Sequence, residues 1–144
     1  MNFKAVLIFS LFAVFFDTAF ANTECVWATG KVICQKNQTL VLNTIVELFD
    51  LDSPQGMNLK NPLDPDDKVA FTQVDEEDGI FQIEGCASDQ DWIPGIKNQP
   101  EMYFRVFHFC NKPNGEYKYI WPIFRVFVPT TYDKHIEDPI ILDD

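Results

Sequence analysis

The chain of 144 residues carries 22 Asp and Glu side chains against 11 Lys and Arg, a net charge of −11. Phosphate binding requires a basic surface, so this balance argues against a nucleic-acid partner. It favours solubility and permits cationic partners or metal ions.

The N-terminal segment has the parts of a secretory signal peptide. Lys4 precedes an apolar run over 5–16, and Ala19-Phe20-Ala21 offers a small-x-small cleavage site after Ala21. A membrane anchor is the alternative, but the run is shorter than the ~20 residues that cross a bilayer. We therefore expect a signal peptide at 1–21 and one mature domain at 22–144, with no transmembrane segment, secreted to the extracellular region or the cell surface.

Short β-rich segments follow one another along the mature chain. Gly, Pro, Asn and Asp separate them, and the longer intervals at 53–67 and 86–100 are expected loops. This pattern, with almost no helix, predicts an all-β two-sheet sandwich of seven to eight strands. The expected strands cover 25–34, 43–52, 68–75, 79–85, 101–110, 116–129 and 139–144.

The mature chain has four cysteines, and an even number in a small exported chain predicts two disulfides. A zinc site would need close ligand spacing such as Cys-x-x-Cys, which the sequence lacks. The sequence leaves three pairings open. The four residues are Cys25, Cys34, Cys86 and Cys110.

The tripeptide Asn37-Gln38-Thr39 is an acceptor for N-glycosylation. Such tripeptides also occur by chance. Together with the signal peptide, it predicts a glycoprotein modified at Asn37.

Five motifs follow in order from Gly30 to Tyr132: "TGKVIC", "NTIVELFDLD", "DPDDKVAFTQVDEEDGIFQIEG", "QPEMYFRVFHFC" and "RVFVPTTY". In this order they resemble the nematode transthyretin-like family. The resemblance implies a transthyretin-like (prealbumin-like) β-sandwich in a secreted or cell-surface protein.

The resemblance also implies a cysteine pairing. The recurrent pair of the family falls on Cys34 and Cys110, which leaves Cys25 with Cys86. The extra cysteines, a longer segment at 53–61 and aromatic residues in place of polar ones depart from the family pattern.

Candidate catalytic residues are few. Ser53 and Ser88 lie outside any G-x-S-x-G motif, and the histidines are His108 and His135. Since His108 alternates with Cys110, we expect a core histidine bonded to the backbone. We expect no enzyme activity and no cofactor; catalysis by His108 with the acidic loops is a weaker alternative.

Two acidic clusters could offer oxygen ligands to a cation: Asp64, Asp66 and Asp67, and the turn at 75–78. Calcium requires several converging carboxylates, and neither cluster fits an EF-hand loop. Asp-rich turns are usually solvated. We expect exposed turns and no metal site.

The segments at 101–110 and 116–129 are apolar on nearly every residue. If Cys110 points inward to a disulfide, alternation also turns Phe104, Val106 and His108 inward. Exposed aromatic side chains beside Arg are typical of partner sites. The alternative is that 53–67 or 86–100 covers this patch. The candidate interaction surface is Tyr103, Arg105, Phe107, Phe109, Arg125 and Phe127.

These features predict an extracellular binding or signalling protein that recognises a protein or a lipid surface through this patch. The alternative is an oligomeric carrier of a small hydrophobic ligand, with a cavity between the subunits of a homo-oligomer. Fold class by itself does not decide between them.

Overall fold

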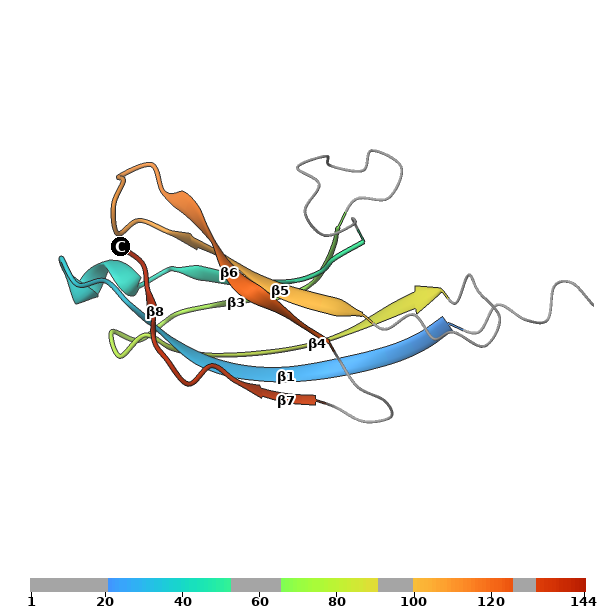
Figure 1. Cartoon of the computed structure of the whole chain (residues 1–144). Coiled ribbons are helices and arrows are strands. Elements are labelled where there is room, and N and C mark those ends of the chain that lie inside the picture. Colours follow the sequence, from blue (N-terminus) through green and yellow to red (C-terminus); the bar gives the residue numbers. More distant parts are fainter. Residues whose placement is uncertain (1–20, 53–65, 91–99, 126–131) are drawn as a thin grey trace, which may run out of the picture.

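The computed structural model describes residues 21–52, 66–90, 100–125 and 132–144, which form eight strands and one short 3-10 helix (Figure 1). The elements in chain order are β1 (Ala21–Ile33), η1 (Gln38–Val41), β2 (Ile45–Asp50), β3 (Asp67–Gln73), β4 (Ile80–Gln90), β5 (Glu101–His108), β6 (Glu116–Arg125), β7 (Tyr132–His135) and β8 (Ile140–Ile141).

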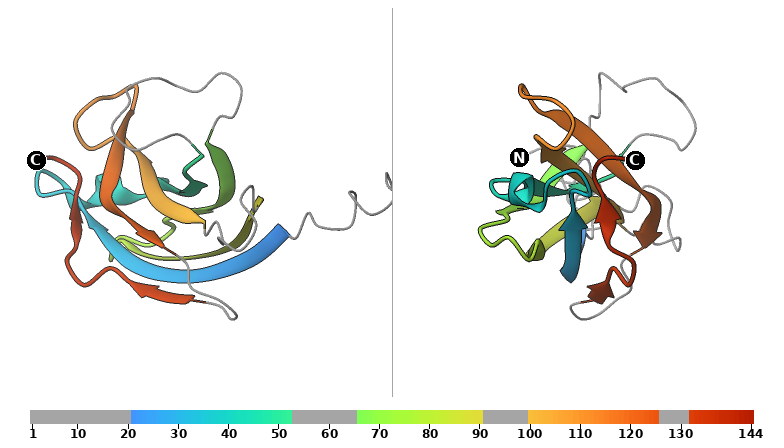
Figure 2. Two further views of the ribbon diagram at one scale, coloured as in Figure 1. Left: turned by 45° about the vertical axis from the view of Figure 1, so that its right-hand side comes forward. Right: turned by 90° about the vertical axis from the view of Figure 1, so that its left-hand side faces the viewer.

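The strands form two sheets that face each other (Figure 2). The first sheet has the order β4-β1-β7, and β8 pairs with the C-terminal part of β1. The second has the order β3-β2-β5-β6. In the first, β1 is antiparallel to β4 and parallel to β7 and β8. The expected all-β two-sheet sandwich is confirmed.

The core lies between the sheets and follows strand alternation. In β1, Val26 and Ala28 are fully buried, whereas Trp27 between them is 38% exposed on the other face. In β5, Phe104, Val106 and His108 are buried, as expected. The sequence pattern therefore places the inward face of β5 correctly.

Two features differ from the expected strands. β4 continues to Gln90, into the interval expected as a loop, because it pairs with β1 as far as Ala21. The polar segment of β7 was not expected to be a strand. It pairs with 26–29 of β1 through backbone hydrogen bonds, and its sequence has no apolar alternation from which a strand could be predicted.

The two disulfides are Cys25–Cys86 and Cys34–Cys110, the pairing that the resemblance implied. The first links neighbouring residues of β1 and β4. The second links the residue after β1 to the segment after β5, so it joins the two sheets. Cys34 and Cys110 are both buried.

Candidate functional site

The outer face of the second sheet carries aromatic and charged side chains in rows across its strands. Glu47 on β2 lies opposite Phe71 on β3 and Arg105 on β5, and Arg105 lies opposite Tyr119 on β6. Cross-strand neighbours of this kind contact one another directly. The outer face is therefore one connected layer of side chains.

A carboxylate with two cations lies at the centre of this layer. Nε of Arg105 donates to Oε2 of Glu47 at 2.7 Å, and Nζ of Lys68 lies 3.4 Å from Oε1. Burial of the Glu47 carboxyl would raise its pKa, but Arg105 and Lys68 outweigh burial and lower the pKa. Glu47 is therefore held ionised and paired.

The Arg105 guanidinium is also held between two rings. Its central carbon lies 4.3 Å from the centroid of Phe49 and 4.6 Å from that of Tyr117. A guanidinium over an aromatic face gains cation–π attraction. Together with the bond to Glu47, this stacking fixes the orientation of Arg105.

Tyr103 lies on the expected outer face, but it is only 4% exposed and so offers little accessible surface. Its ring stacks with Phe49 at 5.5 Å and Tyr119 at 6.3 Å, and its hydroxyl donates to Oδ2 of Asp66 at 2.9 Å. Burial and the Asp66 carboxylate raise the pKa of the Tyr103 hydroxyl. Our expectation of an exposed Tyr103 is wrong, because neighbouring rings cover it.

Phe107 and Phe109 are half-buried. Their rings meet edge to face with centroids 5.1 Å apart, and the centroid of the Phe107 ring lies 5.0 Å from that of Tyr117. Of the other residues expected in the surface, Arg125 ends β6 and its side chain is not described, and Phe127 lies outside the described residues. Residues 53–65 and 91–99 also lie outside the described residues. They belong to the two loops that were expected, as the alternative, to cover the aromatic patch.

Three large exposed side chains on this face were missed by the sequence analysis: Phe71 at 66%, Tyr117 at 53% and Tyr119 at 48%. The signal was present, since Tyr117 and Tyr119 occupy alternate positions and so share a face. We call the set with accessible area the outer aromatic face. It consists of Lys68, Phe71, Arg105, Phe107, Tyr117 and Tyr119.

The histidines belong to the two different sheets. His108 is 1% exposed, and its Nδ1 accepts the Cys110 N–H at 3.3 Å, so the expected core histidine is confirmed. Burial lowers the pKa of His108. His135 is exposed, with Nδ1 2.7 Å from the Thr29 hydroxyl, which ties β7 to β1. Ser88 is exposed on β4, and Ser53 lies outside the described residues.

The acidic residues singled out in the sequence have different surroundings. The turn at 75–78 is exposed, as expected, and Oδ1 of Asp78 accepts the Ile80 N–H at 2.9 Å. Asp67 is exposed, whereas Asp66 is half-buried against Tyr103. Asp64 lies outside the described residues.

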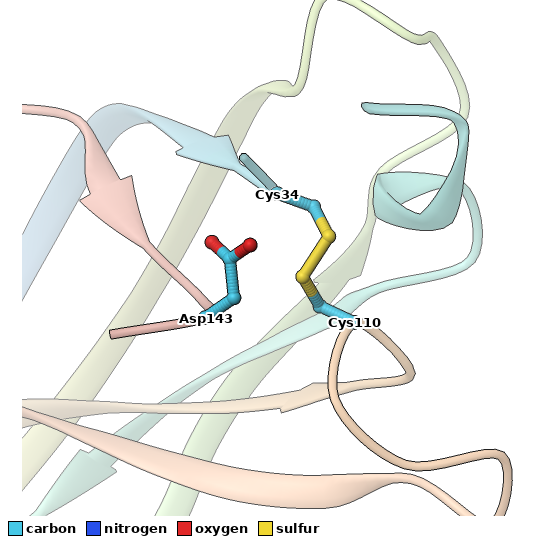
Figure 3. A group of neighbouring side chains, drawn as sticks. All are labelled: Cys34, Cys110 and Asp143. Carbon is cyan, nitrogen blue, oxygen red and sulfur yellow. A yellow bond between two sulfur atoms is a disulfide. The ribbon is translucent and has the colours of Figure 1, made fainter. Parts of the chain in front are cut away.

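Asp143 lies beside the Cys34–Cys110 disulfide (Figure 3). The cysteine sulfurs are bonded to each other and are not thiolate ligands. The Asp143 carboxylate accepts the N–H groups of Gln35 at 2.9 Å and Lys36 at 2.7 Å. This group therefore fastens the C-terminal segment to the turn after β1.

Asn37 is exposed at the start of η1, and its Oδ1 accepts the N–H and the hydroxyl of Thr39. An exposed position is compatible with glycosylation, which stays a prediction. In the described part of the chain, no helix has the length and apolar character needed to cross a membrane.

Comparisons with known proteins assign no family to the chain. A scan against protein-family models finds no match, and a search of curated proteins finds none. Among solved structures, a 9R-lipoxygenase from Cyanothece PCC8801 is 22% identical over 83% of the chain, with a TM-score of 0.40. The chain spans 16% of that lipoxygenase. A similarity this weak carries no conclusion about fold or activity.

Proposed function

We propose that the protein is a secreted extracellular binding or signalling protein that recognises a protein partner through the outer aromatic face. The observation that carries the proposal is the exposure of Phe71, Tyr117 and Tyr119 around the fixed Arg105–Glu47 pair. Aromatic and Arg side chains dominate the energetics of protein interfaces. Because Arg105 is already held in place, less conformational freedom is lost on binding.

A protein partner suits this face better than a lipid surface. Peripheral membrane binding draws on uncompensated Lys and Arg side chains near anionic headgroups. Here Glu47 lies against both Arg105 and Lys68, and the whole chain has a net charge of −11.

Secretion and membership of the transthyretin-like family are part of the proposal. Two disulfides are compatible with an oxidising, extracellular environment. The two-sheet sandwich and the Cys34–Cys110 bridge support the family resemblance.

The test compares a Phe71→Ser, Tyr117→Ser and Tyr119→Ser triple variant with the wild-type protein and with Ile80→Ser. Ile80 is 55% exposed on β4, in the other sheet, and serves as a matched control. Each disulfide-bonded protein is immobilised and used to capture proteins from extracellular fractions. We expect to capture a partner that the wild type and Ile80→Ser retain and the triple variant loses at least tenfold. The triple variant also loses the ring contacts of Tyr117 and Tyr119, so it should melt at a lower temperature and yet stay folded, as measured by circular dichroism.

Two further measurements identify other occupants of the face. Light scattering after gel filtration measures self-association, and sedimentation with anionic phospholipid vesicles measures lipid binding. Loss of a dimer in the triple variant would identify a second copy of the chain as the partner. Vesicle binding lost in the triple variant would identify a lipid surface, and equal capture by all three proteins would contradict the proposal.

A further inference from the structure

The N-terminal end of β1 lies beside acidic side chains that come from both sheets. In the β1–β4 ladder, Asn22 lies directly opposite Asp89. Asp89 near the end of β4, Asp50 at the end of β2 and Asp52 after it each place a carboxylate oxygen within 4.8 Å of the others. In Figure 1 the start of β1 and the ends of β2 and β4 point toward the same side of the molecule. The fold therefore brings the backbone of Asn22 to the place where these carboxylates meet.

The surroundings of Asp50 disfavour its negative charge. Asp50 is 4% exposed, and burial together with the neighbouring carboxylates of Asp89 and Asp52 raises its pKa to about 7. Asp50 and Asp89 also share a side-chain hydrogen bond. An ionised carboxylate can only accept, so this bond requires a proton on one of the two groups. A carboxyl pair that retains a proton near neutral pH is a place where a nearby cation is favourable.

The expected processing of the chain produces a cation at this position. Ala19-Phe20-Ala21 predicts cleavage of the signal peptide after Ala21. Hydrolysis of the Ala21–Asn22 peptide bond consumes one water molecule and leaves a carboxylate on Ala21 and an amine on Asn22. An α-amino group has an ordinary pKa of roughly 7.7–8.0, so it becomes an ammonium near neutral pH. The cleavage motif and the strand register are independent observations, and both point to Asn22.

The new N-terminus is held close to Asp89. Cys25, three positions after Asn22, is bonded to Cys86 on the paired strand. Directly opposite residues of an antiparallel pair have Cα atoms about 4.5–5.5 Å apart. An ammonium on one residue and a carboxylate on the other can bridge this separation. Contact between the Asn22 nitrogen and the Asp89 carboxylate therefore needs no rearrangement of the strands.

We propose that the α-ammonium group of Asn22, formed when the signal peptide is removed, pairs with the Asp89 carboxylate and so joins the start of β1 to the acidic groups of both sheets. The proposal rests on the secretion that is part of the proposed function, and it goes further by giving the new N-terminus a structural role. Removal of the signal peptide stabilises the mature domain in this way, because the unprocessed chain has an uncharged peptide bond at the same position.

Glu24 is the other acid of β1 that could compete for this ammonium. It is 2% exposed, and neither of its carboxylate oxygens has a hydrogen-bond partner. Its neighbour in the ladder is Ala87 rather than an acid, and its carboxylate is not among those that converge around Asp50. The register therefore favours Asp89 as the partner, and a Glu24→Gln variant separates the two.

The test expresses the full chain, with its own signal peptide, in a eukaryotic secretory system. N-terminal sequencing of the secreted protein establishes where the mature chain begins, and we expect Asn22. The α-amine is then acetylated at pH 6.5 with an activated acetyl ester, in guanidinium chloride with the disulfides intact, and the protein is refolded. Lysine amines react little at this pH because their pKa is about 10.4. Mass spectrometry verifies a single acetyl group at Asn22, which removes the charge of the terminus.

Chemical denaturation at pH 7 measures the equilibrium constant of unfolding before and after acetylation. We expect acetylation to raise this constant about tenfold in the wild type, as for the loss of a charged hydrogen bond. In Asp89→Asn the rise should be less than about threefold, because the partner is already missing. Asp75→Asn, in the exposed turn, is the matched control and should respond like the wild type. A steric cost of the acetyl group would be the same in all three proteins.

A mature chain that begins at another residue would overturn the proposal together with the expected cleavage site. A chain that begins at Asn22 and is unaffected by acetylation would overturn the pairing alone, and secretion would stand. Equal losses in the wild type and Asp89→Asn would overturn Asp89 as the partner. If acetylation has no effect in Glu24→Gln and the full effect in Asp89→Asn, the ammonium pairs with Glu24 and the proposal is wrong.

Discussion

Nε of Arg105 donates to Oε2 of Glu47 at 2.7 Å across the β2–β5 pair, in the middle of the outer face. Glu47 is nearly buried, with a side-chain exposure of 9%, whereas Arg105 retains 25%. The pair is thus shielded from water on the side of Glu47, while the stacked guanidinium remains accessible to a partner.

The first prediction concerns the stability that this pair provides. Arg105→Ala removes a charged hydrogen bond to a nearly buried carboxylate and the stacking on Phe49. We expect a loss of about 2–3 kcal/mol in the free energy of unfolding, measured by chemical denaturation. Lys68 contacts the same carboxylate but is 49% exposed. Lys68→Ala should therefore cost less than about 1 kcal/mol, and equal losses would contradict this account.

A second prediction separates packing from exposure on the outer aromatic face. Phe107→Ser removes ring contacts with Phe109 and Tyr117. Full truncation of a core Phe costs about 3–5 kcal/mol, so a half-buried ring should cost about 2 kcal/mol. Phe71 is 66% exposed, and Phe71→Ser should cost less than about 1 kcal/mol. Denaturation curves test this, and a Phe71 variant as unstable as the Phe107 variant would show that Phe71 is covered.

The third prediction is a dependence of stability on pH through His108. Burial depresses the pKa of His108 below its ordinary 6.5. Just below pH 6.5, His108 therefore binds a proton in the unfolded chain but stays neutral in the folded chain. Stability therefore falls as pH drops below about 6.5. Protonation would also remove the Nδ1 acceptor of the Cys110 N–H. The charges near His108 act in both directions: Glu116 and Asp143 favour the protonated ring, and Lys118 and Lys112 oppose it.

Free energies of unfolding measured at pH 7.5, 6.5 and 5.5 test this prediction. We expect His108→Gln to lose less stability than the wild type over this interval, whatever its stability at pH 7.5. His135→Gln changes an exposed histidine and should follow the wild-type slope. If the free energy of unfolding changes with pH equally in the wild type and in His108→Gln, protonation of His108 does not affect folding and the prediction is wrong.

A fourth prediction distinguishes the two disulfides. Cys86 is exposed, whereas Cys34 and Cys110 are buried. Exposed disulfides are the more accessible to thiols. We expect mild reduction followed by alkylation to label Cys25 and Cys86 first, as read by mass spectrometry of the peptides. Earlier labelling of Cys34 and Cys110 would contradict the burial of that bridge.

The stabilities of the two bridges provide a second comparison. The Cys34–Cys110 and Cys25–Cys86 bridges join residues 76 and 61 positions apart in the sequence. The chain-entropy model therefore gives each bridge a contribution of about 4 kcal/mol to the free energy of unfolding. Replacing Cys34 and Cys110 with Ala also removes buried sulfur from the core, so this variant should be the less stable one. If the two variants that each lack one disulfide have equal free energies of unfolding, the bridges stabilise only by restricting the unfolded chain, and the buried sulfurs add nothing.

Local patterns in the sequence predict a large part of the fold. Alternation in β5 correctly places Phe104, Val106 and His108 inward, because successive side chains of a strand point to opposite faces. The turn before Gly79 is also predictable: Gly79 has a φ of 73°, which glycine adopts readily. The β7 strand is not, since its pairing with β1 uses backbone groups that every sequence has.

By itself, the sequence determined which face of β5 each side chain takes, and the tertiary structure decided what covers that face. Tyr103 points outward as alternation requires, yet it is buried because Phe49, Tyr119 and Asp66 arrive from β2, β6 and the residue before β3. Asp50 and Asp89 are 39 positions apart in the sequence and meet because their strands end at the same side of the sandwich. Side-chain direction follows from the geometry of one strand, whereas burial and convergence depend on strands that only the packed sheets bring together.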